Sequence, residues 1–101
     1  MKTEADHKIL IEKIVQGDET AFRKLFDLYY QKLLHLAIYF LHSKELGEEA
    51  VADVFYKVWQ KKDSLAKIND IESYLYISVK NQALHYIRRT PVIDKIPLEL
   101  Y

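Results

Sequence analysis

The stretch Glu19–Leu41 reads ETAFRKLFDLYYQKLLHLAIYFL and decides the fold. Its apolar and aromatic residues recur at steps of three and four, the spacing that places side chains on one face of an α-helix. These residues are Phe22, Leu25, Phe26, Tyr29, Leu33, Leu36, Ala37 and Phe40. At a rise of about 1.5 Å per residue, such a helix is roughly 35 Å long. We expect it to be the spine of a helical domain.

A shorter helical pattern precedes this segment, over about residues 6–16. Leu10, Ile14 and Val15 share one face of this expected helix. Gly17 is typical of a helix C-terminus and Asp18 of an N-cap. The sequence therefore predicts a sharp break between the first helix and the second.

Two more helices are expected downstream. One follows the N-cap Ser43 and reaches about residue 62, and the other spans about residues 71–89, after a polar connection capped by Asp70 or Asn69. Residues 90–101 carry both prolines and no helical period, which indicates a linker or tail. The predicted fold is all-α, a compact bundle of three to four helices over residues 1–89.

Composition restricts the chemistry that the chain can perform. The chain has 101 residues, of which half are hydrophobic and only two are glycine and two proline, a balance typical of helical globular domains. No cysteine is present, so disulfides and thiolate metal sites are excluded. The four histidines lack paired-ligand spacing, and no phosphate loop or nucleophile elbow is found. They are His7, His35, His42 and His85. We expect no enzyme, no metal and no cofactor.

Charge and hydropathy indicate where the chain acts and what it contacts. No apolar run approaches the roughly 20 residues that cross a bilayer, and no signal-type segment opens the chain, so we expect no membrane insertion and a cytoplasmic location. The net charge is zero, which argues against binding nucleic acid by charge alone. However, residues 43–55 carry four acids and one lysine, whereas residues 56–89 carry seven bases and three acids. This sorting is compatible with two different partners.

The last expected helix has apolar residues on two faces. On a helical wheel, Leu75, Val79 and Tyr86 fall in one narrow arc, which we assign to the core. The opposite stripe holds Ile77, Asn81, Leu84 and Arg88. A helix that served only one core would leave a clean polar side, so this stripe needs an explanation.

Two interpretations of the stripe remain open. In the first interpretation, Ile77 and Leu84 pack against another helix or the tail, and Asn81 and Arg88 are solvated. This interpretation needs no ligand, because scattered apolar residues on a protein surface are ordinary. Alternatively, the stripe binds nucleic acid: the Asn81 amide pairs with a base edge, nearby cations hold phosphates, and Tyr74 and Tyr76 stack on an unpaired base for about 1–3 kcal/mol. Packing at the core edge accounts for both tyrosines equally well.

The order of the segments resembles a known family. LIEKIVQGDETAFRKLFDLYYQKLLHLAIYFL (residues 10–41), EEAVADVFYKVWQKKDSL (48–65) and ESYLYISVKNQALHYIRR (72–89) are similar to successive parts of region 2 of bacterial sigma factors, in the extracytoplasmic-function (ECF) group. The last part resembles the family pattern WLYRIARNxALDYLRR. The resemblance covers roughly residues 8–89. It implies a sigma-70 family domain that lends promoter specificity to RNA polymerase.

The resemblance also implies a docking surface for core RNA polymerase. In the family, the third helix docks on the coiled coil of the largest polymerase subunit, and the matching acids here are Glu49 and Asp53. This sequence departs from the usual D-x-x-Q-[DE]-x-F pattern, because Ala52 stands where glutamine is common. Without the family match, a solvated helix N-terminus would explain both acids.

The DNA-binding residues follow from the same resemblance. The connection 63–70 matches a loop that captures a base flipped from the non-template strand of the promoter −10 element, with Asn81 beneath the loop and Lys57 on the preceding helix. Within the loop, Lys67 and Asn69 are the expected contacts. The full set of expected DNA-binding residues is Lys57, Lys67, Asn69, Tyr74, Tyr76, Ile77, Lys80, Asn81, Arg88 and Arg89. Of these, Lys80, Arg88 and Arg89 are expected on backbone phosphates.

Two expectations concern what lies beyond this domain. Family members continue into a second helical domain that reads the −35 element, and no such segment occurs here, so we expect a fragment or isolated domain with 90–101 as the start of a linker. The resemblance also implies an anti-sigma factor that covers these surfaces. The main alternative function is a helical protein-interaction module that binds an anti-sigma factor or another protein and never binds DNA.

Overall fold

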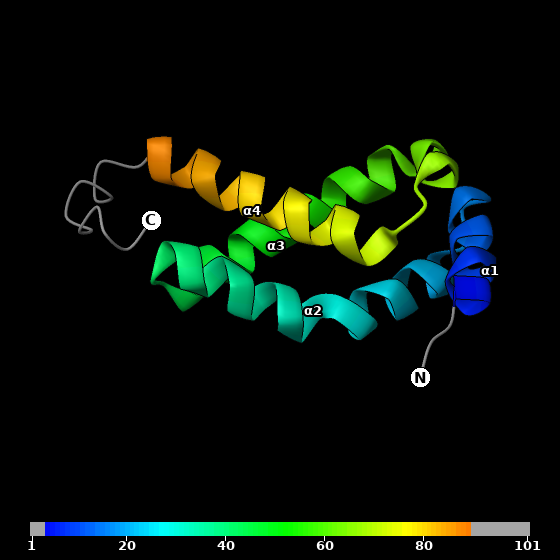
Figure 1. Ribbon diagram of the computed structural model, residues 1–101, viewed down its shortest axis with the longest axis horizontal. Coiled ribbons are helices and arrows are strands. Elements are labelled where there is room, and N and C mark those ends of the chain that lie inside the picture. The colour runs from blue at the N-terminus through cyan, green and yellow to red at the C-terminus, as the bar shows by residue number, and fades with distance from the viewer. Residues whose placement is uncertain (1–3, 90–101) are drawn as a thin grey trace.

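The computed structural model describes residues 4–89 and confirms the all-α fold (Figure 1). Within this range lie four α-helices and one 3₁₀-helix, and no strand: α1 (Glu4–Val15), α2 (Glu19–Leu41), α3 (Lys44–Gln60), η1 (Lys62–Lys67) and α4 (Ile71–Arg89). Helices α2, α3 and α4 contact one another as a bundle, and α1 lies across one end, against α2 and η1. The expected linker at 90–101 lies outside the described residues.

The predicted helix boundaries depend on local caps, and the caps are confirmed. The Asp18 carboxylate accepts a hydrogen bond from the Ala21 N–H at 3.1 Å, and the Ser43 hydroxyl accepts one from the Leu46 N–H at 3.1 Å. Gly17 has φ +91°, a conformation that glycine adopts without steric cost. Each of these contacts spans only a few residues, which is why the sequence alone predicted them.

Of the two caps expected for α4, the structure selects Asp70. One carboxylate oxygen of Asp70 accepts from the Ser73 N–H at 3.1 Å, and the other accepts from the Ser73 hydroxyl at 2.8 Å. These two bonds to Ser73 lower the pKa of Asp70. The side chain therefore stays ionised at neutral pH, where its charge also suits the positive end of the helix dipole.

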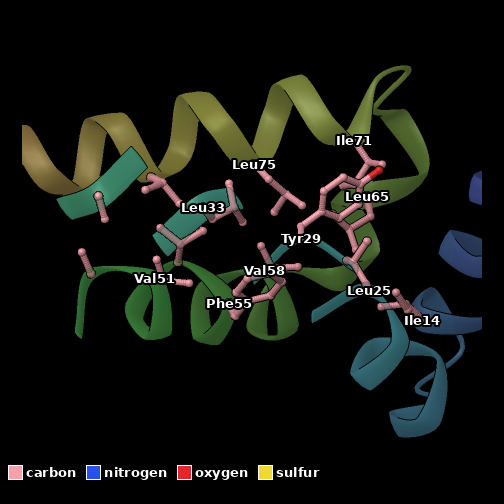
Figure 2. Close-up of a cluster of buried hydrophobic side chains, with 14 of the residues drawn as sticks. Ile14, Leu25, Tyr29, Leu33, Val51, Phe55, Val58, Leu65, Ile71 and Leu75 are labelled. Carbon is pink, nitrogen blue, oxygen red and sulfur yellow. The ribbon is translucent and has the colours of Figure 1, made fainter. Parts of the chain in front are cut away.

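The core lies between the three long helices and extends to α1 and η1 (Figure 2). Each long helix contributes one buried face: Leu25, Tyr29, Leu33 and Ala37 from α2; Val51, Val54, Phe55 and Val58 from α3; Ile71, Leu75, Val79 and Ala83 from α4. Phe22 and Phe26, also predicted to face inward, are half-buried together with Trp59 at the edge between α2 and α3. The Phe22 and Trp59 ring centroids lie 5.0 Å apart there, so aromatic contacts close this edge.

One segment differs from the sequence-based prediction. Helix α3 ends at Gln60, and the expected polar connection instead contains η1. Within η1, Leu65 is only 1% exposed, because α1 packs over it. The loop between α3 and α4 is therefore anchored to the core by its one leucine.

Candidate nucleic-acid and protein interface

The two-sided character of α4 is confirmed by its burial pattern. Leu75 and Val79 are fully buried and Tyr86 is half-buried, whereas Ile77 is 59% exposed and Asn81 is exposed. Among the described residues, the Asn81 side chain has no hydrogen-bond partner, and its amide is free to bind a ligand. Ile77, Asn81 and the exposed Arg88 form what we call the outer stripe of α4. Leu84, expected on this stripe, is half-buried.

The two tyrosines of α4 occupy different environments. Tyr74 is 37% exposed and lies at the border of the outer stripe. Tyr76 is half-buried and packs against the core. Core-edge packing therefore describes Tyr76, while the Tyr74 ring presents a surface on which a base can stack.

Most of the expected cations lie on α4 or next to it. Lys80 and Arg88 are exposed, and the Arg89 guanidinium lies 3.2 Å from Nε2 of His85, one turn back on the same helix. Lys57 reaches across from α3, where its ammonium donates to the Gln82 side-chain oxygen at 3.2 Å. The structure thus brings Lys57 next to α4.

Of the two loop residues expected to contact DNA, one lines a cleft and the other does not. A cleft of about 940 Å³ opens between α1 and the η1 segment, and its walls include His7, Ile11, Ile68 and Asn69. Lys67 is exposed but does not line this cleft, and neither does Asn81. Hence the structure places Asn69 in the cleft wall and leaves Lys67 and Asn81 on outer surfaces.

A contact that the sequence did not reveal holds α1 at this cleft. The Tyr29 hydroxyl lies 2.9 Å from Nε2 of His7. Burial raises the pKa of Tyr29, and the nearby carboxylates of Glu72 and Asp70 raise it further. A tyrosine predicted on the inner face of α2 needs a hydrogen-bond partner, and this requirement was the available signal.

The two acids expected to dock polymerase have different environments. Glu49 is exposed, whereas Asp53 is half-buried and its carboxylate accepts hydrogen bonds from the Tyr86 hydroxyl and, at 3.4 Å, from the Gln82 amide. Burial and then the bond to Asp53 raise the pKa of Tyr86. Glu49 is therefore open to a partner, while Asp53 is engaged by α4.

The structure adds one residue to the surface around Glu49. Tyr56 is 64% exposed and lies two turns beyond Glu49 on the same side of α3, with the exposed Ala52 between them. We call Glu49, Ala52 and Tyr56 the α3 stripe. The sequence-based reasoning missed Tyr56 because it assigned only Glu49 and Asp53 to the docking surface.

Two further kinds of feature are absent from the described residues. Between residues 4 and 89, no cluster of three or more potential ligand side chains is arranged to hold a metal ion. In that same range, no helix is long and apolar enough to span a bilayer. The features described above are a solvent-facing helix stripe with an amide and cations, an acidic surface on the adjacent helix, and the cleft between α1 and η1.

Comparison with known families explains this combination. The family model of sigma-70 region 2 matches residues 25–91. The chain therefore belongs to the sigma-70 region 2 family. The match begins within α2 and takes in α3, η1 and α4, so it includes the two helices that carry the stripes, α3 and α4.

The curated relatives are sigma factors. The chain is 26% identical over 98 residues to the RNA polymerase sigma-H factor of Pseudomonas aeruginosa, with 93% of this chain and 51% of that protein covered. It is 26% identical over 103 residues to the ECF RNA polymerase sigma-E factor of Escherichia coli strain K12, with 98% of this chain and 53% of that protein covered. The chain thus spans about half the length of these relatives. No solved structure matches the chain significantly.

Proposed function

We propose that this chain is the promoter-reading region 2 domain of an ECF-type sigma factor. It docks on core RNA polymerase in the cytoplasm, then recognises the −10 element and helps to melt it. Membership of the sigma-70 region 2 family supports the general role in transcription initiation. The observation that carries the finer role is the exposure of Ile77 and Asn81 on a helix whose opposite face is buried.

DNA recognition in this proposal uses the outer stripe. The Asn81 amide pairs with an edge of an unpaired base, and a base stacks on the exposed ring of Tyr74. Lys57, Lys80 and Arg88 hold the phosphates of the non-template strand, with Arg89 beyond them. Removing a base from the duplex stack costs a few kcal/mol, so contacts made only to the separated strand favour melting.

The loop supplies the second part of the proposed reading surface. Asn69 lies in the wall of the α1–η1 cleft, which is lined by both polar and apolar residues. A flipped base that enters this cleft meets Asn69, and Lys67 on the exposed side of η1 contacts the adjoining phosphate. Two reading positions, the cleft and the outer stripe, then follow one strand along the domain.

Polymerase docking in this proposal uses the α3 stripe. Glu49 offers a charge to a basic partner surface, and Tyr56 offers apolar area at the other end of the stripe. The net charge of zero fits this division of labour, because a neutral domain binds DNA weakly until polymerase holds it against the promoter. The role requires no catalytic group and no cofactor in this chain.

Chemical-shift mapping tests the DNA-reading proposal. We would titrate the isotope-labelled chain with short single-stranded oligonucleotides of different sequence, using the matching duplexes as controls. Shifts that cluster at 63–70, Tyr74, Ile77 and Asn81, and that depend on sequence, are the expected result. No shifts at low salt with any single strand would overturn DNA reading.

The exposed apolar side chain of Ile77 also favours a second candidate, a protein-interaction module. An anti-sigma factor that covers the outer stripe would bury this side chain and block the DNA contacts. The same titration separates the candidates, because a module that binds only protein gives no response to DNA. If an anti-sigma factor and single-stranded DNA compete for the chain, the two bind the same surface.

A further inference from the structure

Helices α3 and α4 are joined by a continuous polar network. The Asp53 carboxylate accepts hydrogen bonds from the Tyr86 hydroxyl and the Gln82 amide nitrogen, the latter at 3.4 Å. The side-chain oxygen of the same Gln82 accepts from the Lys57 ammonium at 3.2 Å. Four side chains from two helices, separated by 25 to 33 residues in the sequence, are thus linked.

This network lies along the half of α4 whose fully buried side chains are small. Beyond Leu75, the fully buried side chains of α4 are the smaller Val79 and Ala83, and the next residue on that face is Tyr86. Small side chains allow a helix to rotate or slide with little loss of contact area, whereas hydrogen bonds require defined distances and angles. The network therefore fixes the C-terminal half of α4 against α3.

The chemistry of the network makes it persistent. Burial and the contact with Asp53 raise the pKa of Tyr86, so its hydroxyl remains a donor throughout the physiological range. Hydrogen bonds to a charged acceptor contribute more than bonds between neutral groups. Asp53 differs in this respect from Glu49, which is exposed and accepts no hydrogen bond from the described residues. Glu49 is therefore free to bind another protein, whereas Asp53 is already bonded within its own domain.

We propose that Asp53 is a positioning residue for the DNA-facing helix rather than a polymerase contact. Through Tyr86 and Gln82 it sets the rotation of α4, and this rotation directs the adjacent Asn81 outward. Gln82 in turn holds the Lys57 ammonium beside the same helix. The meaning of this geometry for DNA rests on the function proposed above, whereas the positioning itself is a property of the domain alone.

The experiment compares three variants: Asp53→Asn, Tyr86→Phe and the double variant. For each we would measure single-stranded DNA affinity, affinity for the coiled coil of the polymerase largest subunit, and amide hydrogen exchange along α4. Glu49→Gln, one turn earlier on α3 and outside the network, is the matched control. Thermal unfolding of every variant reports whether it is folded.

The expected pattern is shared and non-additive. Tyr86→Phe and Asp53→Asn each speed exchange in the C-terminal half of α4 and weaken DNA binding about ten-fold, and the double variant is no worse than Asp53→Asn alone. Tyr86→Phe leaves coiled-coil affinity unchanged. Glu49→Gln does the reverse, weakening coiled-coil binding without altering exchange.

Two results would overturn the inference. One is a loss of coiled-coil affinity in Asp53→Asn while Tyr86→Phe alters neither exchange nor DNA binding, which would return Asp53 to the docking surface. The other is additive effects in the double variant. If Asp53→Asn fails to fold, Gln82→Met combined with Tyr86→Phe removes both bonds to Asp53 and leaves the carboxylate in place. Should no variant or parent bind DNA, the proposed function fails, while the exchange data still decide the positioning role.

Discussion

A β-carbon on Gly47 would lie 2.9 Å from Cγ1 of Ile38, so α3 crosses α2 at a point where no side chain fits. The same β-carbon would lie 3.4 Å from the Ile38 backbone nitrogen, so a change of the Ile38 side-chain rotamer alone would not remove every close contact. Glycine inside a helix costs about 1 kcal/mol relative to alanine. At this position the cost is offset by the close approach of the two helices.

Gly47→Ala is therefore expected to destabilise the fold by about 1–2 kcal/mol, since overpacking costs ~1–3 kcal/mol and improved helix propensity returns up to ~1 kcal/mol. Urea unfolding followed by circular dichroism measures the change. Glu48→Ala, at the exposed neighbouring position, is the control and should be nearly neutral. A gain in stability for Gly47→Ala would show that the crossing is looser than this geometry.

Asn81→Ala is expected to weaken binding of single-stranded −10 DNA while leaving the melting temperature nearly unchanged. The amide is exposed and has no partner among the described residues, so its loss removes a base contact of about 1–3 kcal/mol and no internal bond. Fluorescence anisotropy with labelled oligonucleotides gives the affinity. Gln31→Ala removes an exposed amide from α2 instead and should have no effect on binding. A large drop in melting temperature would mean that Asn81 is structural.

Glu49→Lys is expected to weaken binding to the polymerase coiled coil by several fold, more strongly at low salt, because it reverses a charge on the α3 stripe. Glu48→Lys makes the same change about 100° around the helix and serves as the control. Both positions are exposed, so neither variant should unfold the domain. Equal effects at the two positions would indicate that only net charge matters, and not the stripe.

Tyr56→Ala is expected to reduce coiled-coil affinity more than Glu49→Gln does. Exposed aromatic residues that become buried in an interface often dominate its energy, with losses of about 2 kcal/mol or more on truncation. Tyr39→Ala is a suitable control, because Tyr39 on α2 is similarly exposed, at 66% against 64% for Tyr56. Isothermal titration with the coiled-coil fragment measures both. An unchanged affinity for Tyr56→Ala would remove this residue from the docking surface.

Tyr86→Phe is expected to change the alkaline unfolding of the domain. The unfolded chain loses the tyrosine proton near pH 10, but burial and the Asp53 and Glu49 carboxylates raise the pKa of Tyr86 in the folded state. The folded state holds the proton more tightly, so stability is fully present below pH 10 and is lost as the pH rises above it. The phenylalanine variant should lose stability less steeply there. Urea midpoints at pH 8, 9, 10 and 11 provide the comparison; parallel curves would contradict the raised pKa.

The sequence predicted the parts of the fold that depend on neighbouring residues. The caps at Asp18 and Ser43 are contacts three residues long, and the inner face of α4 follows from helix periodicity alone. Periodicity also separated Asn81 from the core, because an asparagine on the opposite arc of a packed helix faces solvent.

The sequence did not predict contacts that depend on how helices cross. Asp53 and Tyr86 are 33 residues apart, and only the packing of α3 on α4 brings them together. Glu49 and Asp53 lie four residues apart, so their directions around the α3 axis differ by about 40°. This difference is enough for Asp53 to face α4 while Glu49 stays exposed. Tyr86, already placed on the core arc, carried the one available hint, since a buried hydroxyl requires a partner.

The anchored leucine of η1 has a consequence for how such domains diversify. Leu65 is held beneath α1, while Ala66, Lys67 and Asn69 around it are exposed. The path of the loop is set by its buried residue, so exchanges at the exposed positions change the surface offered to a ligand without rerouting the chain. Under the function proposed above, the residue that holds the loop in place and the residues that select the ligand would be different ones, and substitutions at Ala66, Lys67 and Asn69 would change binding preference while Leu65 keeps the fold.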